Sequence, residues 1–267
     1  MSADSLNREL NRLYGNLGMA QMDRRYEKLR DRWDRIHDAE WGGKSNLAQW
    51  HQGCDIREQM GSCISVSLES LHCARALIEG AEAVAPQYAV IRTAIEASST
   101  GLWLSHVGRK NKMIFYSLKL AYRDNSNIMD VATLFGKSRN RGLLNNRKKT
   151  KLRLEEQKRG LKGYSNRNIA SFPSYTQIAK RSDDIVKKRM TYTAEIAWKI
   201  CSGMAHGSRD LIIGLAETIP TGVFDEKTME VTIKQNTLLS AAIMNTAMEN
   251  CEELMQTYEE ACIDATD

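Results

Sequence analysis

Apolar residues recur three or four positions apart along most of this chain, which is the period of an amphipathic α-helix. In the N-terminal third, this spacing predicts one helical stretch from residue 5 to about 37, interrupted near 15–18, and another from about 55 to 82. Pro86 predicts the start of the next helix, because proline suits the first helical position. This part of the chain is therefore expected to be helical.

The same period predicts helices over 110–123, 128–135 and 237–262. Ser182, followed by two aspartates, is typical of a helix start, because these residue types cap helix N-termini. A further apolar stripe begins at Met190 and predicts the helix that leads into the most polar stretch of the C-terminal half.

Between residues 215 and 235 the period shortens toward two, around a turn that contains Asp225, and this alternation predicts a small β-hairpin. The predicted fold is mainly α: a helical bundle with a hairpin near 217–234 and a basic helical excursion near 136–168. One domain over 1–267 is expected, with an N-terminal helical arm at 1–50, a bundle core at 55–135 and 170–267, and the basic insertion at 136–168.

The composition changes this picture little. With 42% hydrophobic and 27% charged residues, the 267-residue chain is typical of a globular protein. The chain has no run of eighteen apolar residues and no signal-peptide pattern, so we expect a cytoplasmic protein without a membrane partner. The six cysteines form no CxxC pair, which favours reduced thiols and argues against a zinc ribbon. We expect no cofactor and no metal.

Charge is distributed unevenly along the chain. Residues 136–167 hold twelve of the 38 Lys and Arg but two of the 33 Asp and Glu, a balance of +10, and the rest of the chain carries −5. This segment is either a projecting helix or an arm that orders on binding, and its charge favours a nucleic-acid backbone as partner. The candidate nucleic-acid-binding residues are Arg147, Lys148, Lys149, Lys151, Arg153, Lys158 and Arg159.

The polar stretch 202–210, Ser-Gly-Met-Ala-His-Gly-Ser-Arg-Asp, interrupts an apolar helical pattern. Gly203 and Gly207 are four residues apart, so one helix face lacks side chains and another backbone or a ligand can approach it. Gly207 either ends this helix, with Ser208 starting the next, or is passed by a continuous helix. The side chains predicted to line the neighbouring face are Ser202, His206 and Arg209.

About a hundred residues earlier, Arg92 and Glu96 are the two charged residues of the apolar stretch 86–106 and share a helix face. We expect this pair to be buried against the stretch 202–210. The candidate catalytic residues are His206, Arg92, Glu96, Ser202 and Arg209. Glu69 and His72, spaced as di-iron ligands are, lack the second such pair that a di-iron bundle requires, so we interpret His72 as a hydrogen-bonded helix histidine.

An apolar helix with Arg-x-x-x-Glu, followed by Ser-x-x-x-His-Gly, resembles a set of all-helical bacterial and phage proteins distantly similar to the HEPN group of helical ribonucleases. The resemblance covers about residues 55–215 and implies action on RNA in a toxin or phage-defence setting. HEPN ribonucleases carry an arginine four to six residues before the histidine on one helix. Here that arginine is absent, so Arg92 or Arg209 would have to replace it.

Two classes of function therefore remain open. In one, His206 exchanges protons and Arg92 or Arg209 binds the phosphate of an RNA substrate, with Glu96 orienting the arginine. In the other, the polar cluster is structural and the protein is a non-enzymatic nucleic-acid or protein-binding module, or an oligomeric helical scaffold. The absence of Walker, dinucleotide-binding, zinc-protease and Gly-x-Ser-x-Gly motifs argues against kinases, dehydrogenases, zinc proteases and α/β-hydrolases.

Overall fold

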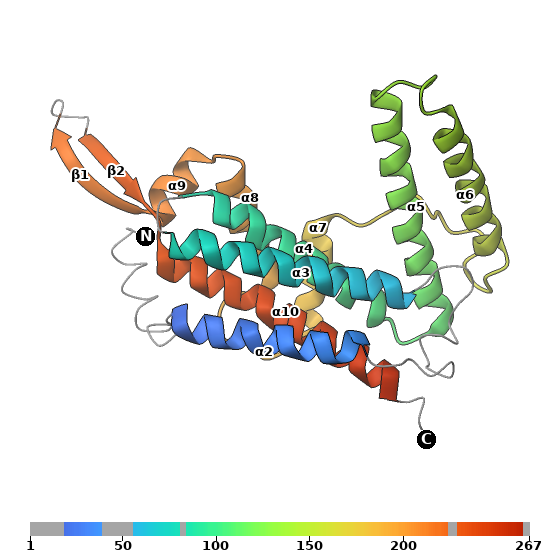
Figure 1. Ribbon diagram of the computed structural model, residues 1–267, viewed down its shortest axis with the longest axis horizontal. Coiled ribbons are helices and arrows are strands. Elements are labelled where there is room, and N and C mark those ends of the chain that lie inside the picture. The colour runs from blue at the N-terminus through green and yellow to red at the C-terminus, as the bar shows by residue number, and fades with distance from the viewer. Residues whose placement is uncertain (1–18, 39–55, 81–83, 224–228, 264–267) are drawn as a thin grey trace. The chain divides into compact units, whose positions relative to one another are not determined.

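The computed structural model describes residues 19–38, 56–80, 84–223 and 229–263. Helices make up most of this part of the chain, and one two-stranded antiparallel sheet accompanies them (Figure 1). The prediction of a mainly α fold with a small hairpin is confirmed. The described residues fall into two compact units: one comprises 19–38, 62–80, 84–102, 175–223 and 229–256, and the other comprises 56–61, 103–174 and 257–263.

The first unit is built on a bundle of long helices: α2 (Met19–Asp38) and the larger parts of α3 (Ile56–Glu79), α4 (Pro86–Ser105) and α10 (Thr237–Ile263). Their apolar stripes meet in a core that excludes water, and its largest side chains include Met22, Ile64, Leu71, Tyr88, Ile91, Ile95 and Leu102. Gly101 lets α4 approach α10, because a Cβ at this position would collide with Leu254. The helices predicted from residue 55, from Pro86 and from residue 237 are all observed.

Three shorter helices complete the helical part of the first unit: α7 (Tyr175–Ile185), α8 (Ala194–Ala205) and α9 (Arg209–Leu215). The prediction that Ser182 starts a helix is wrong, since Ser182 is buried within α7 and its Oγ donates to the Ala179 carbonyl at 2.7 Å. Asp183 caps a different helix. Its carboxylate accepts hydrogen bonds from Ala194 N at 2.6 Å and Glu195 N at 3.1 Å, so α8 begins four residues after Met190.

The hairpin consists of β1 (Glu217–Val223) and β2 (Met229–Lys234), paired from Glu217 opposite Lys234 to Val223 opposite Met229. A register shift between Pro220 and Gly222 marks a bulge in β1. The hairpin predicted near 217–234 is therefore observed. Its strands are mostly exposed, so the alternation of apolar and polar residues in the sequence does not correspond to one buried face of the hairpin.

The second unit contains the antiparallel helices α5 (Lys110–Leu134) and α6 (Arg141–Arg159). The sequence pattern predicted two helices over 110–135, but α5 is continuous. Asn125, which lies between the two predicted helices, is buried in mid-helix, and its Nδ2 donates to the Arg147 carbonyl of α6 at 3.1 Å. The asparagine therefore joins two helices and does not end one.

Most of the large apolar side chains of the segment 128–135, at the C-terminal end of α5, are exposed. The exposed fraction rises from 38% for Ile128 and 51% for Val131 to 87% for Leu134 and 76% for Phe135. The basic segment that follows forms α6, so the first of its two predicted states, a helix, is observed. Among the described residues, no helix is long and apolar enough to cross a membrane.

Candidate functional site

The polar stretch 202–210 lies at the junction of α8 and α9. His206 is the C-cap of α8, Gly207 follows with a φ of 71°, and Ser208 is the N-cap of α9. Of the two predicted alternatives, the one in which the helix ends at Gly207 is observed. The left-handed backbone at Gly207 ends α8 and turns the chain toward α9, and the His206 side chain is exposed.

Arg92 on α4 lies between Glu96 and His206. Its Nε donates to Glu96 Oε1 at 2.7 Å, and its Nη1 is 3.2 Å from His206 Nε2. Glu96 Oε1 also accepts from Trp198 Nε1 at 2.8 Å, and the Arg92 guanidinium lies 5.0 Å from the centre of a Trp198 ring. The structure therefore brings together three of the five predicted catalytic residues and adds Trp198.

The guanidinium of Arg92 has only donors, so Nε2 is the nitrogen of His206 that can accept in this contact. Glu96 and the Trp198 ring hold the arginine in turn, and the side chains of Arg92 and Glu96 are 25% and 19% exposed. The predicted burial of this pair is only partial, and the cluster is open to solvent through His206.

The other two predicted residues do not join this cluster. Ser202 is half-buried on α8, one helical turn from both Trp198 and His206, and within the described part of the chain its side chain makes no hydrogen bond. Arg209 is exposed at the first position of α9 and has no ion pair there with a described residue. Of the two candidate arginines, only Arg92 contacts His206.

Gly203 has a structural role. A Cβ at this position would collide with Leu211 of α9, so the bare helix face predicted for a ligand or a backbone is covered by a leucine side chain. In the sequence, Trp198 falls within the apolar stripe that begins at Met190. Its spacing of four residues from Ser202, which is itself four residues from His206, is the signal that could have placed it on the polar face.

A second polar cluster, which the sequence pattern did not reveal, lies within the first unit around Arg189. Its guanidinium Nε is 2.8 Å from Asp183 Oδ1, its Nη1 is 3.6 Å from Glu249 Oε2, and its Nη2 donates to Asn250 Oδ1 at 2.6 Å. The Arg189 side chain is 7% exposed, and this burial lowers its pKa. Asn250 Nδ2 also donates to Ser99 Oγ at 2.9 Å, which connects the cluster to α4. The enclosed carboxylates and amide indicate a structural role.

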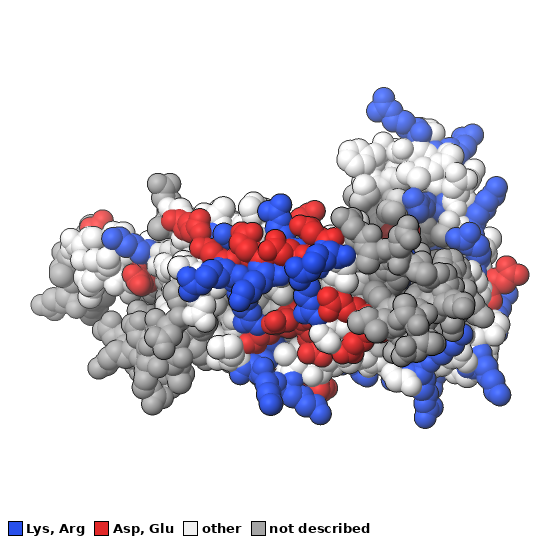
Figure 2. Space-filling model, turned by 60° about the horizontal axis from the view of Figure 1, so that its bottom comes forward, with Lys and Arg blue, Asp and Glu red and all other residues white. Residues whose placement is uncertain are grey.

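The seven candidate nucleic-acid-binding residues all lie on α6. Lys148, Lys149, Arg153 and Arg159 are exposed, whereas Arg147 and Lys151 are half-buried. Lys158 forms an ion pair with Glu155 at 2.8 Å. Figure 2 shows basic and acidic side chains interleaved over one face of the molecule, and mostly basic ones projecting at its right side. The four exposed residues are available to a phosphate backbone.

Comparison with known proteins gives no relative on which to base an assignment. No family model matches the sequence, and searches of curated proteins and of solved structures found no match. The function is therefore argued from the geometry of the chain itself.

Proposed function

We propose that this protein binds the sugar-phosphate backbone of nucleic acid through α6. The observation that supports the proposal is the group of exposed basic side chains on this helix, of which Lys149 and Arg153 are four residues apart and share a face. Within the part of the chain that the structure describes, no acidic side chain forms an ion pair with Lys148, Lys149 or Arg153. Binding of this kind is largely indifferent to sequence, because phosphate contacts carry no base information.

The test is fluorescence anisotropy with a labelled RNA oligonucleotide of about 20 nucleotides and its DNA counterpart. We expect binding by the wild type that weakens steeply with salt, and a loss of at least about tenfold in affinity for the triple variant Lys148→Gln, Lys149→Gln, Arg153→Gln. The matched control is Lys187→Gln, Lys188→Gln, which removes exposed charges from the segment after α7.

Equal affinity of the triple variant and the wild type would contradict the proposal. Self-association at low salt without oligonucleotide binding would also contradict it, and would favour the oligomeric scaffold in which the basic segment pairs with the acidic remainder of another copy.

A second candidate function is cleavage of RNA at the Arg92–His206 pair, in the toxin or phage-defence setting that the HEPN resemblance implies. The observation that favours it is the solvent-accessible His206 beside a guanidinium held in place by Glu96 and Trp198. In the reaction, Arg92 would move its hydrogen bond from His206 Nε2 to the phosphate and stabilise the charge that develops there, which frees Nε2 to accept the 2′-hydroxyl proton. The 2′-oxygen then bonds to phosphorus, and the 5′-oxygen leaves and takes a proton from solvent. Neither the Ser202 nor the Arg209 side chain forms a hydrogen bond or ion pair with Arg92, Glu96 or His206, so in this function their role would be limited to contacts with the substrate.

Cleavage is tested by incubating total RNA with purified wild type and with His206→Ala and Arg92→Lys. We expect both variants to lose activity, by about 100-fold or more for His206→Ala. The control is Glu195→Gln, which removes an ion pair with Lys199 on the surface of α8. This variant is expected to retain the cleavage activity. If the wild type leaves RNA intact, or if His206→Ala cleaves as well as the wild type, the cluster is structural.

A further inference from the structure

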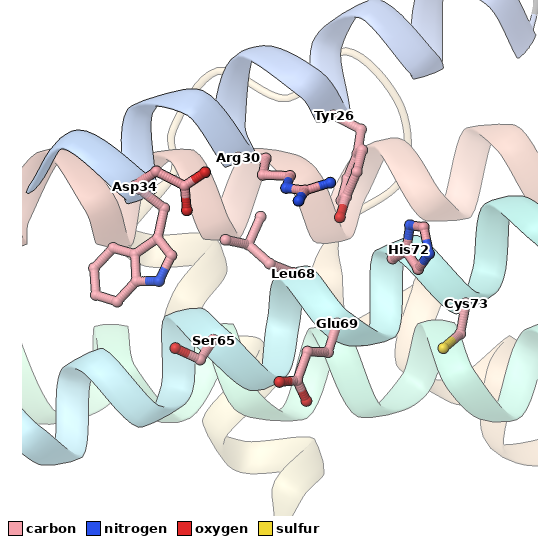
Figure 3. A pocket seen from close by; sticks show the side chains of 9 residues that line it. Tyr26, Arg30, Asp34, Ser65, Leu68, Glu69, His72 and Cys73 are labelled. Carbon is pink, nitrogen blue, oxygen red and sulfur yellow. The ribbon is translucent and has the colours of Figure 1, made fainter. Parts of the chain in front are cut away.

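A groove lies between α2 and α3 in the first unit, and none of its lining residues belongs to the Arg92–His206 cluster, the Arg189 cluster or α6. Its volume is about 570 Å³, within the range of small-molecule sites in proteins. Figure 3 shows that its side chains come from both helices: Tyr26, Arg30 and Asp34 from α2, and Glu69 and His72 from α3. The two helices are held in register by Arg75, which forms ion pairs with Asp23 at 2.7 Å and Glu27 at 2.8 Å.

The floor of the groove is apolar and buried. Tyr26, Trp33 and Leu68 line it and are 4%, 7% and 6% exposed. The Tyr26 ring packs against His72, with 5.9 Å between ring centres, and is covered on another side by the Arg75 guanidinium at 4.6 Å. These neighbours fix the Tyr26 ring in position, and Trp33 and Leu68 provide the apolar surface of the groove.

The hydroxyl of Tyr26 is the first of two unused polar groups. The residue is more than nine-tenths buried, yet no described residue forms a hydrogen bond with its hydroxyl, which points into the groove in Figure 3. Burial also raises the pKa of Tyr26, so the hydroxyl keeps its proton and remains a donor. The hydroxyl is therefore free to donate to an acceptor group of a ligand in the groove.

Arg30 is the second unused group. It lines the groove one helical turn from Tyr26, and neither Asp34 nor any other described residue forms an ion pair with it. This contrasts with Arg25 and Arg75 in the same unit, which both have carboxylate partners. Arg30 and Tyr26 together offer several N–H donors and one O–H donor to a single acceptor group.

We propose that this groove binds a small planar organic anion, whose carboxylate or phosphate group lies between Arg30 and the Tyr26 hydroxyl and whose apolar body rests on Trp33 and Leu68. The carboxylates of Asp34 and Glu69, on the rim of the same groove, select for a ligand that also carries an amine or hydroxyl group. A metal ion does not fit the groove, because the described His, Cys, Asp and Glu side chains form no group of three that could hold one.

The probe is 8-anilinonaphthalene-1-sulfonate, whose sulfonate stands in for the carboxylate or phosphate, compared with the neutral N-phenyl-1-naphthylamine, which has a similar aromatic body. Both are titrated into the full chain and followed by dye fluorescence. We expect one high-affinity site that prefers the sulfonate dye by about tenfold or more. Arg30→Gln should abolish that preference. Tyr26→Phe should lower the affinity for the sulfonate dye several-fold more than the affinity for the neutral dye.

Two controls separate the groove from other surfaces. Arg24→Gln removes an exposed arginine from α2 that does not line the groove, and should leave both affinities unchanged. Leu134→Ser with Phe135→Ser removes the exposed apolar end of α5, where a dye could also bind. Absence of binding, equal binding of the two dyes by the wild type, a preference that survives Arg30→Gln, or loss of binding in the α5 variant would each overturn the proposal.

Discussion

Arg189 shows how much a single buried charge contributes to this fold. It is enclosed by Asp183, Glu249 and Asn250, and Glu249 Oε1 also accepts a hydrogen bond from Met190 N at 2.9 Å. Because Asp183 caps α8 as well, the position of that helix depends on the same cluster. Arg189 is therefore a structural residue for the segment that carries Trp198 and His206.

Replacing Arg189 with alanine leaves two largely buried carboxylates without their cation. We expect a loss of about 3–5 kcal/mol in the free energy of unfolding, measured by urea denaturation. The neighbouring Lys188 is exposed, so Lys188→Ala should change stability by no more than about 0.5 kcal/mol. Similar stabilities of the two variants would show that the charge of Arg189 is not required to stabilise the carboxylates of Asp183 and Glu249.

Thiol reactivity gives a second prediction at this scale. Cys201 and Cys251 are fully buried, and burial raises the pKa of both thiols, that of Cys251 to about 12. Since the thiolate is the reactive form, a raised pKa means less of it at pH 8. We expect iodoacetamide to label the exposed Cys73 in the native protein and to reach Cys201 and Cys251 only after unfolding, as mapped by mass spectrometry. Rapid native labelling of Cys251 would contradict its burial.

At the scale of elements, the junction of α8 and α9 depends on two glycines with different functions. Gly207 provides a left-handed backbone, and Gly203 provides space for Leu211. We expect Gly207→Ala to cost about 1–2 kcal/mol through backbone strain, which no second substitution at Leu211 relieves. The measurement is the shift in the urea midpoint of each variant.

For Gly203→Ala the expected cost is about 1–3 kcal/mol, because the added methyl group collides with Leu211. Leu211→Ala removes the colliding atoms, so the double variant Gly203→Ala, Leu211→Ala should be destabilised by less than the two single changes together. Strict additivity of the two effects would indicate that α9 moves away freely and that the packing is loose.

The element boundaries also show where sequence patterns fail. Periodicity alone located α3, α4, α10 and the hairpin, because each depends on local spacing. Asn125 and Ser182 differ from the prediction for one reason. Both are polar residues that favour turns and caps, but each has tertiary hydrogen bonds inside a helix: Asn125 donates to the Arg147 carbonyl, and Ser182 Oγ contacts Ser99 and Asn250. A cap signal therefore predicts a helix boundary only where no buried partner is present.

At the scale of the whole molecule, the segregation of charge is the feature with a measurable consequence. The segment 136–167 carries +10 and the remainder −5. If α6 binds a phosphate backbone, each neutralised charge contributes to the dependence of affinity on salt.

The slope of log affinity against log salt concentration measures those contacts. For the triple variant Lys148→Gln, Lys149→Gln, Arg153→Gln we expect the slope with single-stranded RNA to decrease in magnitude by about 2, because about 0.7 counterions are released per phosphate contact. The measurement is anisotropy between about 50 and 200 mM salt. An unchanged slope would mean that these three side chains do not contact phosphates.

The sequence by itself determined the helical class, the hairpin, the basic segment and most helix starts, because these follow from local periodicity, cap residues and charge. It also predicted one cluster of Arg92, Glu96, Ser202, His206 and Arg209, of which the structure brings Arg92, Glu96 and His206 together. Only the tertiary structure decided that Arg92 and not Arg209 contacts His206 across 114 residues, that Trp198 joins them, and that Arg189 is buried. It also placed Tyr26 and Arg30 in one groove. Periodicity shows which face of a helix is apolar, but which faces meet, and which polar groups remain without a partner, is fixed only when the helices pack.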